Sequence, residues 1–240
     1  MTTPERAARG GLKLATALQI LEHAGRLDPD GLELEPQAQL QAIIDALCDL
    51  SMRDGLTGLM NAGYFRSTLK SELERCARTG HTCALMLLDL DRFKLVNDTY
   101  GHQTGDLVLK TFATQLAKAL RGMDLAARMG GDEFAVLLPE CAATDAVRAA
   151  KRIHEQLNPL IVRAGDVTLD VTVSAGMVWT QPETETSPKS FLARADEELY
   201  RAKRSGGHAL CHPHLVATRI SAAEHASLII PSLEEEECYE

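Results

Sequence analysis

Four carboxylates in this 240-residue chain follow short apolar or glycine-containing segments, and they are Asp89, Asp91, Asp132 and Glu133. Acids at the ends of neighbouring strands tend to converge at one edge of a sheet. Oxygen ligands of this kind suit hard cations such as Mg²⁺, which also contact substrate phosphates. Acids at strand ends are commonly solvated turn residues as well. The spacing alone therefore leaves a metal site and a solvated rim both open.

The segments that would position these acids alternate between helical and strand-like patterns from Asp54 onward. Apolar spacing predicts helices over 61–78, 104–121, 144–157 and 190–204 and strands over 83–90, 125–129, 133–138 and 168–178. The middle two strands are expected to form a hairpin turning at Gly130-Gly131, because glycine tolerates positive φ. Gly206-Gly207 is expected to end the last helix. The order predicts an α+β (mixed α/β) fold, with helices flanking a central sheet that contains antiparallel strands.

The first 53 residues show helical spacing without strand alternation. Two helices are expected, around 12–21 and 40–50, with a turn at 28–31 where the sequence reads DPDG. The second helix has an apolar stripe close to that of a coiled coil and leads directly into the next segment. An amphipathic helix that packs on its own domain would show the same stripe. Both interpretations stay open.

The composition limits the classes of partner. The formal net charge is −9, and five of the acids lie in the last seven residues. This balance argues against nucleic acid or an anionic membrane as the main partner, while a small anionic ligand remains compatible. The six cysteines are scattered without a zinc-type spacing, which is typical of reduced cytosolic thiols. Without a signal-peptide pattern or a run of 18 apolar residues, the chain is expected to be cytoplasmic and to lack a membrane span.

Three ordered motifs carry a resemblance to a known family. Residues 128–134 read RMGGDEF, residues 54–61 read DGLTGLMN, and residues 89–106 read DLDRFKLVNDTYGHQTGD. Together they resemble the GGDEF family, the bacterial diguanylate cyclases, over about residues 54–211. The resemblance implies a nucleotidyl-cyclase domain similar to a polymerase palm. Residues 1–53 would then be a helical stalk or regulatory region, and residues 212–240 a C-terminal extension with an acidic tail.

The resemblance implies an enzyme that joins two GTP molecules into cyclic di-GMP, with release of two pyrophosphates, across a dimer of such domains. Two Mg²⁺ (or Mn²⁺) ions per site would be held by Asp89, the carbonyl of Leu90 and Asp132. Asp132 or Glu133 would help to deprotonate the attacking 3′-hydroxyl, and Lys94 would contact phosphate. Such a site fits phosphoryl transfer, which depends mainly on positioning and charge neutralisation.

The substrate-binding positions implied by the resemblance are Phe93, Asn97, His102, Asp106, Gly130, Gly131 and Lys203. A carboxylate at Asp106 suits guanine, because it can accept from N1–H and the exocyclic amine together. Adenine lacks that pair of donors, so GTP is favoured over ATP. Taken singly, Asn97 is an ordinary turn residue, Asp106 an ordinary helix-start acid and the glycine pair an ordinary hairpin turn.

A second group upstream of the GGDEF signature resembles the R-x-x-D product-inhibition site of the family. It consists of Arg121 and Asp124, with Arg152 (and Arg148 one turn before it) and Arg75 at the positions of partner arginines. Arginine suits this role because its planar fork can address a guanine edge or a phosphate in bidentate fashion. The alternative is a surface Arg–Asp ion pair worth at most about 1 kcal/mol.

Two departures from the family pattern bear on activity. Ala62-Gly63 replaces arginines that commonly follow the first motif, and Gly207 stands where a phosphate-binding arginine is usual. Arg201 or Arg204 could supply that charge from the same helix. The leading hypothesis is an active diguanylate cyclase, and the alternative is a catalytically silent cyclic di-GMP receptor. Homodimerisation through the N-terminal helices is expected, with a separate regulatory protein acting on those helices.

Overall fold

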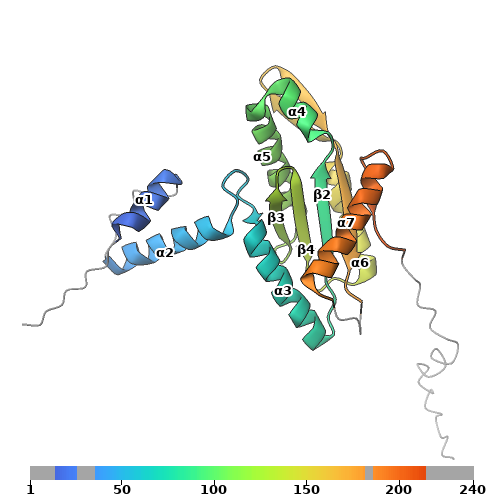
Figure 1. Ribbon diagram of the computed structural model, residues 1–240, viewed down its shortest axis with the longest axis horizontal. Helices are drawn as coiled ribbons and strands as arrows, with labels where there is room; N and C mark the ends of the chain where they lie inside the picture. The colour runs from blue at the N-terminus through green and yellow to red at the C-terminus, as the bar shows by residue number, and fades with distance from the viewer. Residues whose placement is uncertain (1–13, 26–35, 182–185, 215–240) are drawn as a thin grey trace, which may run out of the picture.

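The computed structural model describes residues 14–25, 36–181 and 186–214 (Figure 1). Its helices are α1 (Ala15–His23), α2 (Pro36–Met52), α3 (Ala62–Thr79), α4 (Phe93–Tyr100), α5 (His102–Ala119), α6 (Ala143–Leu157) and α7 (Pro188–Arg204). Its strands are β1 (Met60–Asn61), β2 (Ala84–Leu90), β3 (Leu125–Gly130), β4 (Glu133–Leu138), β5 (Leu160–Ala164), β6 (Val167–Val171), β7 (Val173–Trp179) and β8 (Leu210–Cys211). The expected turn at 28–31 and the acidic part of the C-terminal extension lie outside the described residues.

The central sheet has six strands in the order β1-β3-β4-β2-β7-β8. The four inner strands are antiparallel to their neighbours, while the two-residue edge strands β1 and β8 pair in parallel. Strand β2 lies between β4 and β7, and it pairs with β7 along its whole length and with β4 from Ala84 to Asp89. The predicted central sheet flanked by helices is thus confirmed, and β5 and β6 form a separate hairpin.

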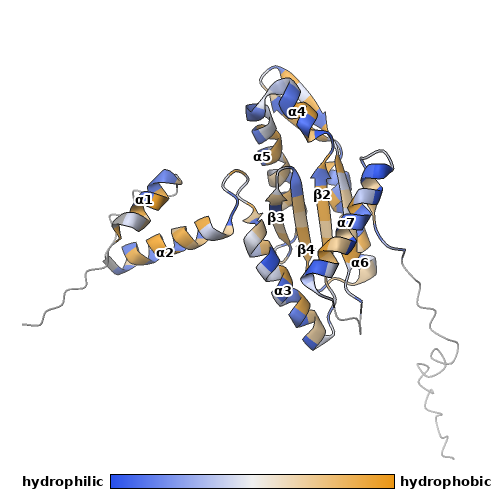
Figure 2. Ribbon diagram, viewed as in Figure 1, coloured by the Kyte–Doolittle hydropathy of each residue, from blue (hydrophilic) through white to orange (hydrophobic). Residues whose placement is uncertain are grey.

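Helices cover both faces of this sheet, α5 and α6 on one and α3 and α7 on the other (Figure 1). Side chains alternate along a strand, so Met86, Leu88 and Leu90 of β2 pack with the α5/α6 core. Leu85 belongs to the opposite core with α3 and α7. Figure 2 shows the corresponding apolar strands behind helices of mixed hydropathy. This alternation sends Asp89 to the α3/α7 face.

Several elements differ from the sequence expectation. The expected strand 168–178 is two strands, β6, which pairs with β5, and β7, which pairs with β2. Thr172 lies between them, and its carbonyl accepts the N–H of Asp91 (2.8 Å). Helix α5 begins at His102 instead of 104, and α4 was not expected as a helix. Strand β3 extends through Gly130, so the hairpin turn is Gly131 and Asp132, one residue later than predicted.

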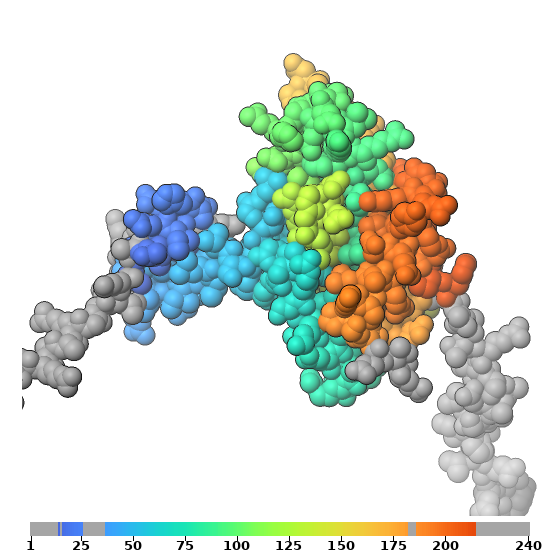
Figure 3. Space-filling model, in the orientation of Figure 1, coloured from blue at the N-terminus to red at the C-terminus, as the bar shows by residue number. Residues whose placement is uncertain are grey.

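Helices α1 and α2 form a small pair of their own at the N-terminal end. Leu21 and Ile43 are buried, whereas Ile20 and Ile44 are 48% and 44% exposed. Figure 3 shows this pair as a lobe beside the body of the molecule. Within the described part of the chain, none of the helices is long and apolar enough to cross a membrane.

Candidate active site

Three charged side chains meet at the end of β2. Asp89 lies directly opposite Glu133 of β4, so both side chains are on the α3/α7 face. The ammonium of Lys203, in the last turn of α7, lies 2.6 Å from Oδ2 of Asp89. The backbone N–H of Leu90 donates to the carbonyl of Asp132 (3.3 Å), which holds the hairpin turn against the end of β2. Of the four expected carboxylates, Asp89 and Glu133 therefore converge, with Asp132 in the adjoining turn.

The electrostatics of this rim are dominated by negative charge. Asp89 is 7% exposed. Burial raises its pKa, Lys203 opposes that shift, and the charges of Asp132 and Glu133 raise the pKa further, so that it lies above the usual range. One lysine therefore compensates only part of the charge of three acids. A cluster of hard oxygen donors with this imbalance fits a bound divalent cation.

Arg128 holds the glycine-containing turn, a role that the sequence motifs did not reveal. Its Nε and Nη2 donate to the carbonyl of Gly131 (3.0 and 2.8 Å), and its Nη1 pairs with Asp54 (3.3 Å). Burial alone would raise the pKa of Asp54, but hydrogen bonds from Thr57 and the charge of Arg128 hold it below its usual range. The spacing of Asp54 and Thr57, an acid followed three residues later by threonine, is the signal that could have indicated the turn at 54–57.

Asp91 has a structural position instead of a place at the charged rim. Its carboxylate accepts hydrogen bonds from the hydroxyls of Ser174 (2.6 Å) and Thr172 (2.7 Å) and from the backbone N–H of His208 (2.8 Å). The chain turns after Leu90, which directs Asp91 toward the loop that follows α7. Gly207 lies in that loop with φ +78°, and a Cβ there would come 3.0 Å from Asp91 Oδ1. An arginine at 207 would be strained in this backbone and would press on the Asp91 carboxylate.

The expected guanine-binding positions lie on α4 and α5, which join at Gly101. Asn97 is half-buried on α4, while His102 and Asp106 are exposed on the first turns of α5. Gly105 leaves room for Asn97, since a Cβ at 105 would overlap its Oδ1. Phe93, expected at the substrate site, and Lys94, expected to contact phosphate, are the first two residues of α4. Phe93 is buried and Lys94 is exposed.

An open pocket of about 940 Å³ lies between α4, the β5–β6 hairpin and the end of α7. Asp89, Lys203 and Gly207 line it, together with residues 168–172. The volume is in the range of small-molecule sites. The expected guanine residues and Lys94 are not part of its lining, so the structure does not gather all the predicted substrate residues around one cavity.

Arg121, Asp124 and Arg152 of the expected inhibitory residues lie at the end of α5, where Asp124 and Arg152 bind protein backbone, whereas Arg75 lies on α3. Asp124 Oδ2 accepts the backbone N–H of Arg121 (2.9 Å) and thereby closes a turn after α5. Nη1 of Arg152 donates to the carbonyl of Ala119 (2.7 Å), at the end of the same helix. The guanidinium of Arg75 is bonded to Glu72 and, at 2.6 Å, to Glu140.

The remaining positions singled out in the sequence have local roles. Asn61 is the N-cap of α3, and its side chain accepts from the N–H of Tyr64 (2.9 Å). Ala62-Gly63 then forms the first turn of that helix. Arg201 donates to Glu198 (2.7 Å), so this candidate substitute for a phosphate-binding arginine is held by a neighbouring acid.

Comparison with known proteins places this geometry in a family. Residues 51–209 match the model of "Diguanylate cyclase, GGDEF domain". The chain belongs to the GGDEF family. The polymerase-palm-like GGDEF fold implied by the sequence motifs is confirmed by solved GGDEF structures. One is the coiled coil and GGDEF domain of DgcB from Caulobacter crescentus in complex with c-di-GMP, at TM-score 0.68 and 28% identity, covering 84% of this chain and 100% of that one.

Two further relatives extend the comparison. The diguanylate cyclase SiaD from Pseudomonas aeruginosa, in complex with its activator SiaC, has TM-score 0.67 and 36% identity, covering 83% of this chain and 74% of that one. The response regulator PleD of Caulobacter vibrioides is 40% identical over 214 residues, covering 84% of this GGDEF chain and 47% of PleD. This GGDEF protein thus spans about half the length of that curated relative.

Proposed function

We propose that this GGDEF protein is a diguanylate cyclase that uses Mg²⁺ or Mn²⁺ to join two GTP molecules into cyclic di-GMP. The observation that best supports this is the meeting of Asp89, Glu133 and Lys203 at the end of β2. Two carboxylates and an ammonium on one rim can hold a metal-bound triphosphate. The similarity to named diguanylate cyclases supports the same reaction.

Asp89, Asp132 and the carbonyl of Leu90 are the donors proposed to hold two divalent ions. When bound, the ions would neutralise phosphate charge and lower the pKa of the attacking 3′-hydroxyl. Asp132 or Glu133 would accept the proton of that hydroxyl, and the exposed position of Glu133 beside Asp89 supports Glu133 in this role. Lys203 would exchange its bond to Asp89 for a phosphate oxygen once the metal neutralises the carboxylate. Lys94 is exposed at the start of α4 and would approach the same phosphates.

Guanine recognition is assigned to the junction of α4 and α5. Asn97 and Asp106 would bind the Watson–Crick edge of the base, with His102 beside them and Phe93 supporting α4 from below. Gly130 and Gly131 would let the hairpin backbone approach the phosphates. Since one chain offers one such set, two chains must face each other for two nucleotides to react.

The test is production of cyclic di-GMP from GTP and Mg²⁺ over a dilution series of the protein. The rate per chain should fall on dilution, because the reaction needs two chains. Asp89→Asn and Glu133→Gln should each lower kcat by at least about 100-fold, on the scale of lost charge stabilisation or general base catalysis. Glu155→Gln, an exposed acid on α6, is the matched control. Folded protein that binds cyclic di-GMP but gives no product would identify a silent receptor instead.

Product inhibition is proposed at Arg121 and Asp124, with Arg152 and Arg75 as further contacts. Arg121 is exposed, and the bond from its backbone to Asp124 leaves its guanidinium available to a ligand. Arg75 would have to leave Glu140 to take part. Arg121→Ala should shift the inhibition curve to higher cyclic di-GMP while the initial rate stays similar. Arg163→Ala, an exposed arginine of β5, should leave the curve unchanged.

Dimerisation through α1 and α2 is proposed from their exposed isoleucines, with a regulatory protein acting on the same helices. One solved relative is a diguanylate cyclase in complex with its activator, which supports such a partner. Ile44→Glu should lower both the mass measured by light scattering and the activity per chain. An unchanged mass would show that the dimer forms elsewhere.

A further inference from the structure

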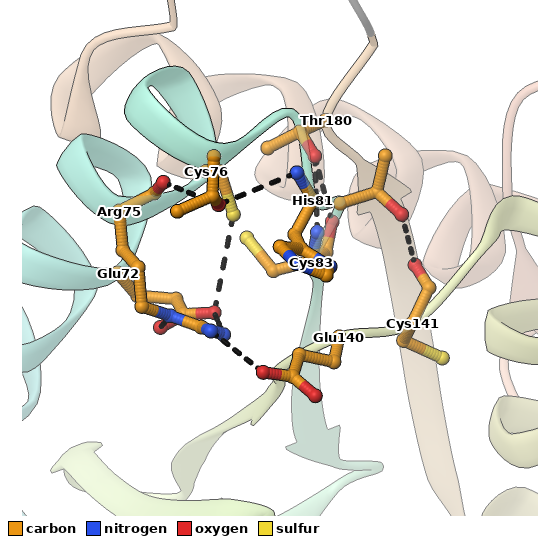
Figure 4. Close-up of polar contacts among 10 residues, drawn as sticks. Glu72, Arg75, Cys76, His81, Cys83, Glu140, Cys141 and Thr180 are labelled. Carbon is orange, nitrogen blue, oxygen red and sulfur yellow. Dashed lines mark hydrogen bonds and ion pairs between the residues drawn. The ribbon is translucent and has the colours of Figure 1, made fainter.

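Three side chains with metal-binding atoms converge far from the nucleotide rim, at the junction of α3 and β2. They are Glu72, Cys76 and Cys83, whose carboxylate oxygen and two sulfurs all lie within 4.8 Å of one another. Figure 4 shows them turned toward one another, with Cys76 Sγ 3.9 Å from Glu72 Oε1. The Glu72 side chain is 11% exposed, and the two cysteines are 6% and 0% exposed. The cluster is thus nearly closed to solvent.

The backbone fixes the directions of all three side chains. Glu72 and Cys76 are four residues apart on α3 and therefore lie on one face of the helix. Cys83 is held on both sides by Thr180, because its N–H donates to the threonine hydroxyl (3.0 Å) and its carbonyl accepts the threonine N–H (2.9 Å). Glu72 and Cys76 belong to α3, and Cys83 and Thr180 stand directly before β2 and directly after β7, so the cluster is preorganised by the ends of regular elements.

We propose that Glu72, Cys76 and Cys83 form a binding site for one soft divalent cation, Zn²⁺ in the first instance, with water as the fourth ligand. Tetrahedral zinc with Zn–S bonds of about 2.3 Å requires an S···S separation of about 3.8 Å and an S···O separation of about 3.6 Å. The observed separations of at most 4.8 Å need a contraction of about 1 Å. Two thiolates favour zinc over Mg²⁺.

Arg75 provides the counter-charge of this site. Its Nε and Nη2 donate to the two oxygens of Glu72, at 2.9 and 2.7 Å, while its Nη1 binds the more exposed carboxylate of Glu140 at 2.6 Å. Zn²⁺ with two thiolates and one carboxylate has a net charge of −1, which the guanidinium opposes. A counter-charge in contact with the buried cluster lowers its desolvation penalty. The guanidinium also orients the carboxylate, as outer hydrogen-bond partners commonly do for metal ligands.

The site is independent of the proposed cyclase activity. Cys83 directly precedes β2 and Asp89 is the sixth residue of that strand, so the two lie about 20 Å apart along the extended chain. No sequence motif indicated this site, because six residues separate Cys76 from Cys83 and Glu72 lies four positions before Cys76. The metal would join the end of α3 to the start of the central strand.

Cobalt provides the first test, because Co²⁺ substitutes for zinc and reports its ligands spectroscopically. Full-length protein without a histidine tag, reduced and free of nucleotide, is titrated with Co²⁺. One equivalent should produce a near-ultraviolet sulfur-to-cobalt charge-transfer band and intense visible bands of tetrahedral cobalt. Zn²⁺ should then bleach both. A spectrum of octahedral cobalt without the sulfur band would overturn the proposal.

Variants provide the second test. Cys76→Ser and Cys83→Ser should remove the sulfur band, and Glu72→Gln should weaken Zn²⁺ binding at least about tenfold in competition with a chromophoric chelator. Cys141→Ser is the matched control, since Cys141 is also a buried free thiol. Equal Zn²⁺ affinity in the wild type and Glu72→Gln, whose side chain reaches solvent, would contradict the assignment even if a cysteine variant failed to fold.

Proton release gives a third readout. A free thiol carries its proton at neutral pH, whereas zinc binds the deprotonated thiolate. Calorimetry in buffers of different ionisation enthalpy should therefore show about two protons released per Zn²⁺. Release of none would mean that the thiols are not ligands.

Discussion

Removal of the Asp91 carboxylate tests whether this acid organises the loop after α7 instead of binding metal. Asp91→Ala deletes three hydrogen bonds to one charged acceptor. Ser174 is fully buried, so its hydroxyl would lose its partner at a cost of about 2 kcal/mol. The Thr172 hydroxyl and the His208 N–H can reach water and would cost about 0.5 kcal/mol each. The free energy of unfolding should fall by about 3 kcal/mol, equivalent to about 6–12 °C in Tm.

Urea unfolding, with an unchanged m value, measures this loss. Ser174→Ala and the double variant complete a cycle, whose coupling energy should be about 1–2 kcal/mol because the two side chains share one bond. A destabilisation of less than 1 kcal/mol for Asp91→Ala, or a coupling energy near zero, would refute the assignment. The dependence of the remaining cyclase activity on metal concentration should match that of the wild type. Loss of a metal ligand would instead change that dependence.

Three further outcomes follow from the packing and charge of the domain. Gly105→Ala should raise the KM for GTP about tenfold or more, because the added Cβ displaces Asn97. Gly122→Ala is the control, because a Cβ at that position meets open space and should leave the KM unchanged. Steady-state kinetics measures the KM of both variants. The depressed pKa of Asp54 means that the unfolded state binds the proton more readily. Its contribution to stability is therefore present above the usual Asp pKa and lost as the pH falls through the lower folded value. Asp54→Asn should flatten the acid limb of stability between about pH 5 and pH 2, measured by urea midpoints. Gly176→Ala would place a Cβ against the backbone of α7 and should cost about 3 kcal/mol in urea unfolding, again compared with Gly122→Ala.

Long amphipathic segments were predicted well because burial of one face dictates their period. Helices α6 and α7 lie within two residues of their predicted bounds at either end. Helix α4 has only eight residues, which is too few turns for a helical period to be told apart from that of other short segments. The two-residue edge strands β1 and β8 form only because they pair with segments distant in the sequence. The local residue pattern therefore does not predict them.

The site was predictable to the extent that it follows strand alternation. The meeting of Asp89 and Glu133 comes from the register of β2 with β4. Asp91 has the same residue type and lies two positions away, but the strand ends between them, so its different role could not be seen. The Arg128–Asp54 pair joins positions 74 residues apart and likewise needs the fold.

The double pairing of β2 sets a limit on insertions and deletions. Because β4 and β7 bond it on both edges, an inserted residue between Cys83 and Asp89 cannot be absorbed by an edge bulge facing solvent. Each side chain beyond the insertion would change face, sending the Asp89 carboxylate into the α5/α6 core and away from Lys203. Substitutions along this strand change side-chain volume and stability to different degrees. The number of residues must stay constant, because otherwise the side chains at its two ends no longer face their present partners. The turn between β5 and β6 carries no such constraint, so changes in chain length within the domain should accumulate there.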